Sequence, residues 1–162
     1  EGKGSTFHFT IELPINANRK VYINEERTKQ LSSLDGVQVL LAEDNQVNLA
    51  VAKRFLQKWG ITVTEAVNGR EAVEKFRPGV FDVLLIDLEM PEMDGYTLTT
   101  RMRADARLKD TFVLLHTSLS GVFNNAMVEK VGANQFIAKF KPDLLASAVM
   151  QQVKAKQQQL GG

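Results

Sequence analysis

The sequence predicts an α/β fold, a doubly wound parallel sheet with helices on both faces. Two observations predict it. From Gly36 onward, strand-like runs alternate five times with helical patterns, and such alternation is typical of a parallel sheet. Two of the runs, 37–42 (VQVLLA) and 83–86 (VLLI), are almost wholly apolar, as expected of central strands buried on both faces.

The first two strand–helix units follow directly from Gly36. Residues 37–42 form a strand, and 45–59 form a helix because apolar and small side chains recur at helical spacing before Gly60 ends it. Residues 61–66 form the second strand. Asn68 then caps a helix that runs to about Phe76, and we expect three of its side chains to face inward: Ala72, Val73 and Phe76.

The last three units repeat the pattern. The third unit is a strand at 81–87 and a helix from Tyr96 to about Ala106. The fourth is a strand at 111–117 and a helix at 124–131. The fifth is a strand at 133–139 and a helix from Pro142 to about Lys156.

The segment before Gly36 has a different texture. Residues 7–13 (FHFTIEL) alternate apolar and polar side chains, which predicts a half-buried strand ended by Pro14. Residues 15–35 are polar and mixed in charge, and we interpret them as a linker. The chain begins with Glu1 rather than Met, so we expect a segment of a longer protein.

Composition excludes several classes of function. The chain has 162 residues and a net charge of +1, which gives no electrostatic case for binding nucleic acid or an anionic membrane. It has no cysteine, so disulfides, thiol catalysis and cysteine-based zinc sites are excluded. No apolar run is long enough to span a bilayer and no signal peptide is evident; we expect a cytoplasmic location.

Acidic side chains follow two predicted strands at the point where each ends. Glu43 and Asp44 follow the first strand, and Asp87 ends the third. In a parallel sheet the functional site lies at the carboxyl ends of the strands. If these two strands are neighbours, three carboxylates converge there, and a hard cation such as Mg²⁺ would relieve their repulsion. One carboxylate could also attack a phosphoryl group.

The fourth and fifth predicted strands end in groups that suit phosphoryl oxygens. Thr117 and Ser118 end the fourth strand, and Lys139 ends the fifth. A hydroxyl can donate a hydrogen bond to such an oxygen, and an ammonium offers it a point charge. Taken alone, Thr117 or Lys139 would be an ordinary surface residue; the signal lies in all five positions together. His8 and His116 are interpreted as structural, and we expect His116 to point away from Thr117 by strand alternation.

Residues 36 to about 157 resemble a response-regulator receiver domain. The resemblance rests on four motifs: VLLAEDNQVN (39–48), LLIDLEMPEMDG (84–95), LLHTS (114–118) and GANQFIAK (132–139). The first motif is similar to receivers attached to hybrid sensor histidine kinases. Residues 1–14 resemble the end of a histidine-kinase ATP-binding domain. The resemblance therefore implies a kinase remnant at 1–15, a linker at 16–35, a receiver at 36–158 and a tail at 159–162.

The resemblance also implies roles for the site residues. The fold would be flavodoxin-like, with strand order 2-1-3-4-5. Asp87 would be the phosphoacceptor, and Mg²⁺ would be held by Asp44 and Asp87 directly, by Glu43 through water and by the backbone carbonyl of Glu89. The switch pair would be Thr117 and Phe136, and Lys139 would pair with the phosphoryl group.

One departure from the family pattern concerns the residue after the site lysine. The family usually has Lys-Pro here, often with a cis bond, whereas this chain has Lys139-Phe140. A second candidate, Lys141-Pro142, lies two residues on, and strand parity sends both lysines to the same side. Spacing from Gly132-Ala133 favours Lys139.

By this resemblance, the function would be acceptance of a phosphoryl group from a phosphohistidine onto Asp87. The donor and partner would be a histidine phosphotransfer protein or the kinase's own phosphohistidine, and the switched surface would be the fourth helix, fifth strand and fifth helix. The only enzymatic activity expected of this segment would be removal of its own phosphoryl group. Two alternatives remain: a docking module that is not phosphorylated, and an aspartate-nucleophile phosphatase, for which the second acid would be Glu89. Residues 2–6 (GKGST) do not predict a nucleotide-binding P-loop, because the upstream glycine and the preceding strand of that motif are absent.

Overall fold

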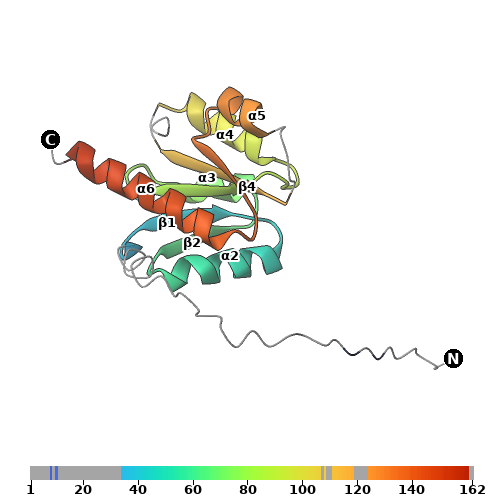
Figure 1. The fold of residues 1–162 in the computed structure, drawn as a ribbon. Helices are drawn as coiled ribbons and strands as arrows, with labels where there is room; N and C mark the ends of the chain where they lie inside the picture. The colour runs from blue at the N-terminus through green and yellow to red at the C-terminus, as the bar shows by residue number, and fades with distance from the viewer. Residues whose placement is uncertain are drawn as a thin grey trace.

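The computed structural model describes residues 8, 10, 34–106, 108, 111–118 and 124–160. Within this part of the chain, a five-stranded parallel sheet has the order β2-β1-β3-β4-β5 and is flanked by helices (Figure 1). The predicted fold class and strand order are confirmed.

The elements alternate along the chain as the sequence predicts. The strands are β1 (Gln38–Ala42), β2 (Thr62–Ala66), β3 (Val83–Asp87), β4 (Phe112–Thr117) and β5 (Gln135–Ala138). The helices are α2 (Gln46–Lys58), α3 (Gly69–Lys75), α4 (Gly95–Ala104), α5 (Asn124–Val131) and α6 (Pro142–Leu160).

Two apolar layers hold the helices against the sheet. One contains buried side chains of α2 and α6 packed on the strands, among them Leu49, Leu56, Val149, Leu41 and Leu85. The opposite layer contains side chains of α3, α4 and α5, among them Ala72, Leu98, Met102, Val128 and Leu84. Neighbouring strand residues such as Leu84 and Leu85 face opposite layers, because side chains alternate along a strand. Helices therefore cover both faces.

The predicted central strands are the most buried. Every residue of β3 is buried, and β1 is buried from Val39 onward. A site at the end of β3 therefore stands on a rigid base, because a strand packed on both faces has little freedom to move.

Two helices begin directly after an asparagine that caps them. Asn45 accepts backbone hydrogen bonds at the start of α2, and Asn68 does the same for α3. The inward position predicted for Val73 is wrong. Its side chain is 44 % exposed, because α3 has only seven residues and its contact with the core passes through Ala72, one position earlier.

Predictions for the first part of the chain lie mostly outside the described residues. Of the strand predicted at 7–13, only His8 and Thr10 are described; both are exposed and neither is in a strand. The linker at 16–35 is described only at Leu34 and Asp35. No described helix combines the length and apolar character needed to cross a membrane.

Candidate functional site

The carboxyl ends of four strands meet at one edge of the sheet. β1 pairs with β3 up to Ala42 and Ile86, so Glu43 and Asp87 follow side by side. Asp87 is in register with His116 of β4, and Thr117 is in register with Ala138, the residue before Lys139. Strand order and register thus bring together most of the strand-end groups that the sequence singles out, namely Glu43, Asp87, Thr117 and Lys139.

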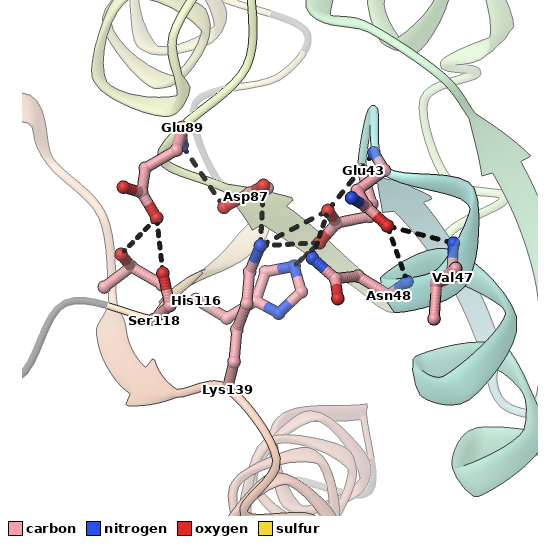
Figure 2. Close-up of polar contacts among 10 residues, drawn as sticks. Glu43, Val47, Asn48, Asp87, Glu89, His116, Ser118 and Lys139 are labelled. Atoms are coloured by element: carbon pink, nitrogen blue, oxygen red, sulfur yellow. Dashed lines mark hydrogen bonds and ion pairs between the residues drawn. The ribbon is translucent and has the colours of Figure 1, made fainter. Parts of the chain in front are cut away.

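Lys139 lies at the centre of this cluster (Figure 2). Its Nζ donates to Asp87 Oδ2 at 2.7 Å and to Glu43 Oε1 at 3.2 Å, and it lies 2.9 Å from Glu43 Oε2. The lysine side chain is only 5 % exposed, and those of Glu43 and Asp87 are 0 % and 2 % exposed. One buried cation therefore balances two buried carboxylates. This leaves an excess of negative charge in the site, and uncompensated buried charge is energetically costly.

The pKa values reflect this crowding. Burial raises the pKa of Glu43, and the neighbouring Asp87 carboxylate adds to the rise, while the hydrogen bond from Lys139 works against it. Burial lowers the pKa of Lys139, but its hydrogen bonds to Asp87 and Glu43 outweigh that effect, so its pKa is raised overall. The site therefore attracts positive charge and keeps its lysine protonated.

Further contacts hold Glu43 and Asp87 in place. Asn48 of α2 donates its side-chain amide to Glu43 Oε1 at 3.1 Å. The backbone N–H of Glu89 donates to Asp87 Oδ1 at 3.2 Å. Asn48 was missed by sequence reasoning as a site residue; the signal was its place in the EDN-x-x-N motif, one turn after the cap Asn45.

Thr117 and Glu89 meet on the other side of Asp87. The Thr117 hydroxyl donates to Glu89 Oε2 at 3.3 Å and the Ser118 hydroxyl donates to the same oxygen at 2.7 Å. Thr117 is fully buried. The family resemblance implied a role only for the backbone carbonyl of Glu89. In the structure its side-chain carboxylate is a hydrogen-bond partner of both hydroxyls.

Asp44 and Phe136 lie further from the centre. Asp44 is half-buried in the turn after β1, and the compact group of potential ligands contains Glu43, Asp87 and His116 but not Asp44. Phe136 is half-buried and packs against the layer of α3, α4 and α5.

Gly95 is needed where α4 begins beside the site. A Cβ atom at this position would lie 2.5 Å from the carbonyl oxygen of Asp87 and 3.0 Å from Cα of Leu88. No real Cβ contact is that short, so only glycine allows the helix to start so close to the strand end. Gly95 thus allows the loop that follows Asp87 to return close to the end of β3.

The two candidate lysines have different surroundings. Lys139 points to the carboxylates, whereas Lys141 is exposed. No described peptide bond is cis, and Phe140 instead adopts a φ of +61° with its side chain 61 % exposed. A bulky residue in the left-handed region is strained. The chain therefore turns after Lys139 at a residue poorly suited to the turn.

His116 approaches the site from the face opposite Thr117. Strand alternation predicted that His116 points away from Thr117, and the structure agrees. Its neighbours Leu114 and Ile137 belong to the layer of α2 and α6. Its Nε2 lies 3.6 Å from Glu43 Oε2. Burial lowers its pKa to about 4; the Asp87 carboxylate works against this effect, and the Lys139 ammonium adds a smaller lowering of its own. The ring is therefore neutral near pH 7.

Comparison with known proteins decides the family. Residues 39–150 match the response regulator receiver domain. The chain belongs to this family. As a receiver domain, it is 37 % identical over 102 residues to the aerobic respiration control sensor protein ArcB of Escherichia coli K12, which covers 63 % of this chain and 13 % of ArcB. The chain therefore spans only a small part of the length of such curated relatives.

Solved receiver structures have the same fold. The signal receiver domain of a signal transduction histidine kinase from Syntrophus aciditrophicus is 32 % identical with a TM-score of 0.65, covering 74 % of this chain and 91 % of that one. The receiver domain of the sensor histidine kinase PA1611 from Pseudomonas aeruginosa PAO1 is 29 % identical with a TM-score of 0.65, covering 74 % and 98 %. That structure has a magnesium ion coordinated in its active-site cleft.

Proposed function

We propose that this receiver domain accepts a phosphoryl group on Asp87 from a phosphohistidine. The observation that carries the proposal is the Asp87 carboxylate itself. It ends a fully buried strand, its Oδ2 is paired with Lys139 Nζ at 2.7 Å, and its Oδ1 is oriented by the Glu89 N–H. A nucleophile held this rigidly in a charged setting suits phosphoryl transfer, which depends on positioning and electrostatic stabilisation.

The residues present also fit Mg²⁺. Glu43 and Asp87 bring carboxylate oxygens together at a site where burial and carboxylate repulsion raise the pKa of Glu43, and magnesium prefers oxygen ligands. We propose Asp44 and Asp87 as direct ligands, with Glu43 acting through water and Glu89 through its carbonyl. When bound, Mg²⁺ would supply positive charge that offsets the repulsion between the carboxylates and the incoming phosphoryl oxygens.

The proposed transfer uses side chains that already lie at the site. An Asp87 carboxylate oxygen forms a bond to phosphorus while the phosphorus–nitrogen bond of the donor breaks. The electron pair of that bond stays on the imidazole, which takes up a proton when it is released. Lys139, freed from part of its pairing with Asp87, is positioned to bind a phosphoryl oxygen.

Thr117 would then exchange hydrogen-bond partners. Its hydroxyl contacts Glu89 Oε2 at a long 3.3 Å, so a charged phosphoryl oxygen would be a stronger acceptor. Movement of Thr117 would allow Phe136 to turn inward, because both side chains lie on the same face of the sheet. The surface formed by α5, β5 and α6 would change with it.

The proposed partner is a histidine phosphotransfer protein or the phosphohistidine of the kinase to which the receiver is attached. Support comes from the histidine kinases among its relatives. We further propose that residues 36–158 are the receiver of a hybrid sensor histidine kinase.

The test is labelling with acetyl phosphate and Mg²⁺, read by intact mass. We expect one phosphoryl group in the native sequence, none in Asp87→Asn, and unchanged labelling in the matched control Asp143→Asn, which alters an exposed acid of α6. Chelation should abolish labelling. Full labelling of Asp87→Asn would refute the assignment. A folded protein that takes no label would instead favour the docking module that is not phosphorylated, for which the strained Phe140 is the structural argument.

A further inference from the structure

A buried imidazole nitrogen faces the carboxylate cluster without a partner. His116 is 7 % exposed, and its Nε2 has no hydrogen-bond partner among the described residues. Buried polar atoms are nearly always paired, so each exception needs an explanation. Figure 2 shows the ring beside Lys139 and Glu43, and the proposed phosphoryl transfer makes no use of it.

The geometry points to a bound cation that uses this nitrogen. One ligand atom each from Glu43, Asp87 and His116 lies within 4.8 Å of the other two. In tetrahedral zinc sites with bonds of about 2.0–2.1 Å, neighbouring ligand atoms lie roughly 3.3–3.5 Å apart. His116 Nε2 and Glu43 Oε2 are already 3.6 Å apart, so small side-chain rotations would bring them to that separation.

We propose that Glu43, Asp87 and His116 form a zinc site. It shares Glu43 and Asp87 with the magnesium site proposed above and differs from it in using His116. Two carboxylates and one imidazole are a ligand set that zinc readily accepts, with a fourth position left for water. Magnesium favours oxygen ligands. His116 would therefore discriminate between the two ions. The proposal does not require Asp87 to accept a phosphoryl group.

Room exists beside two of the three ligand residues, Glu43 and His116. A cavity of about 40 Å³ is lined by Glu43, His116 and Lys139, together with apolar side chains of α2 that include Val51 and Phe55. That volume exceeds what a single water molecule needs. A water completing the coordination of zinc could therefore occupy it.

Lys139 is the competitor for this site. Its ammonium lies 2.7 Å from Asp87 Oδ2 and 2.9 Å from Glu43 Oε2, so it supplies the positive charge that a zinc ion would otherwise bring. Zinc must displace it to reach both carboxylates. Removing the ammonium should therefore tighten zinc binding, whereas removing the imidazole should weaken it.

The experiment is a calorimetric titration of the untagged protein with Zn²⁺ alone, without a phosphodonor. Cobalt absorption in the visible range serves as a second readout of a tetrahedral site. We expect the native protein to bind one equivalent of Zn²⁺, with an affinity at least roughly tenfold weaker in His116→Gln. The control His8→Gln alters the other histidine, which is exposed, and should leave the zinc affinity unchanged. Mg²⁺ affinity should stay the same in His116→Gln.

Equal zinc affinity in the native protein and His116→Gln would overturn the proposal, as would loss of binding in His8→Gln. Lys139→Met provides an independent test if His116→Gln does not fold, as judged by circular dichroism. Tighter zinc binding in Lys139→Met supports the site, and unchanged or weaker binding overturns it. Because binding is measured without phosphoryl transfer, failure here leaves the proposed function of Asp87 untouched, and failure of labelling leaves the zinc site untouched.

Discussion

Lys139 is the residue on which the electrostatics of the site depends most. It is the cation that contacts both buried carboxylates, Glu43 and Asp87, and its side chain is 5 % exposed. Removing one partner of a buried ion pair leaves the other charge uncompensated, which costs more than the pair itself contributes. Lys139 therefore affects stability as well as phosphoryl chemistry.

We predict that Lys139→Met lowers the free energy of unfolding by about 2–4 kcal/mol near neutral pH, because Glu43 and Asp87 lose their counter-charge. Mg²⁺ should restore more stability to this variant than to the native protein, since a bound cation replaces the missing charge. Urea unfolding with and without Mg²⁺ measures both effects.

The matched control for this experiment is Lys141→Met. It removes an equal charge two residues along the chain, where the side chain is exposed, so we expect a change within about 0.5 kcal/mol. Equal losses in the two variants would mean that the buried pairing of Lys139 has no special effect on stability.

His116 predicts how stability changes with pH. Its pKa is lowered from 6.5 to about 4 in the folded chain, so the unfolded chain binds more protons between these values. Its contribution is fully present above about pH 6.5 and is lost as the pH falls toward about 4, at roughly 1.4 kcal/mol per pH unit. Glu43, Asp87 and Lys139 face the same ring, and the raised pKa of Glu43 adds its own contribution to the pH dependence.

The variant His116→Gln isolates the contribution of the imidazole. Between about pH 7 and about pH 5, in the presence of a chelator, we expect the native protein to lose about 1–2 kcal/mol more stability than the variant. Urea unfolding at both pH values gives the difference. Parallel losses in the two proteins would show that the imidazole is not held neutral by burial.

At the scale of elements, the turn from β5 into α6 carries the departure from the Lys-Pro pattern. Phe140 has a φ of +61° and an exposed side chain. A non-glycine residue in this conformation costs about 1–3 kcal/mol. The strain is located next to Lys139. The turn that positions the site lysine therefore contains a residue in a backbone conformation that its side chain disfavours.

Phe140→Asn should therefore stabilise the protein by about 0.5–1 kcal/mol, because asparagine tolerates the left-handed region better than phenylalanine. The change in melting temperature on thermal unfolding measures this gain. A loss of stability would mean that contacts of the Phe140 ring at the mouth of the neighbouring cavity outweigh the backbone strain.

The sequence predicted the elements well because their signals are local. Buried strands appear as apolar runs, and the caps Asn45 and Asn68 lie where the helices begin. The end of α6 was less predictable: the helix continues to Leu160, since its polar last turns contain no glycine or proline before Gly161. Val73 was misplaced because a short helix has few inward positions.

For the molecule as a whole, strand order accounts for the location of the site. The order β2-β1-β3-β4-β5 puts β3 between β1 and β4, so Asp87 lies between Glu43 and His116. Convergence at this edge could be predicted from sequence once the fold class was known.

Side-chain contacts within the site could not be predicted in the same way. These contacts depend on side-chain rotamers and on the packing of α2. They include the hydrogen bond from Asn48 to Glu43, the hydrogen bonds from two hydroxyls to Glu89 and the approach of His116 to Glu43. These are properties of the assembled core, and spacing along the chain does not specify them.

The central claim is that Asp87 is the residue that carries the phosphoryl group, and the most direct measurement locates that group. After labelling with acetyl phosphate and Mg²⁺, borohydride reduction converts an aspartyl phosphate to homoserine, which peptide mass spectrometry assigns to one position. The account predicts homoserine at position 87 alone. Homoserine at position 44, or a labelled protein with unmodified Asp87, would contradict it.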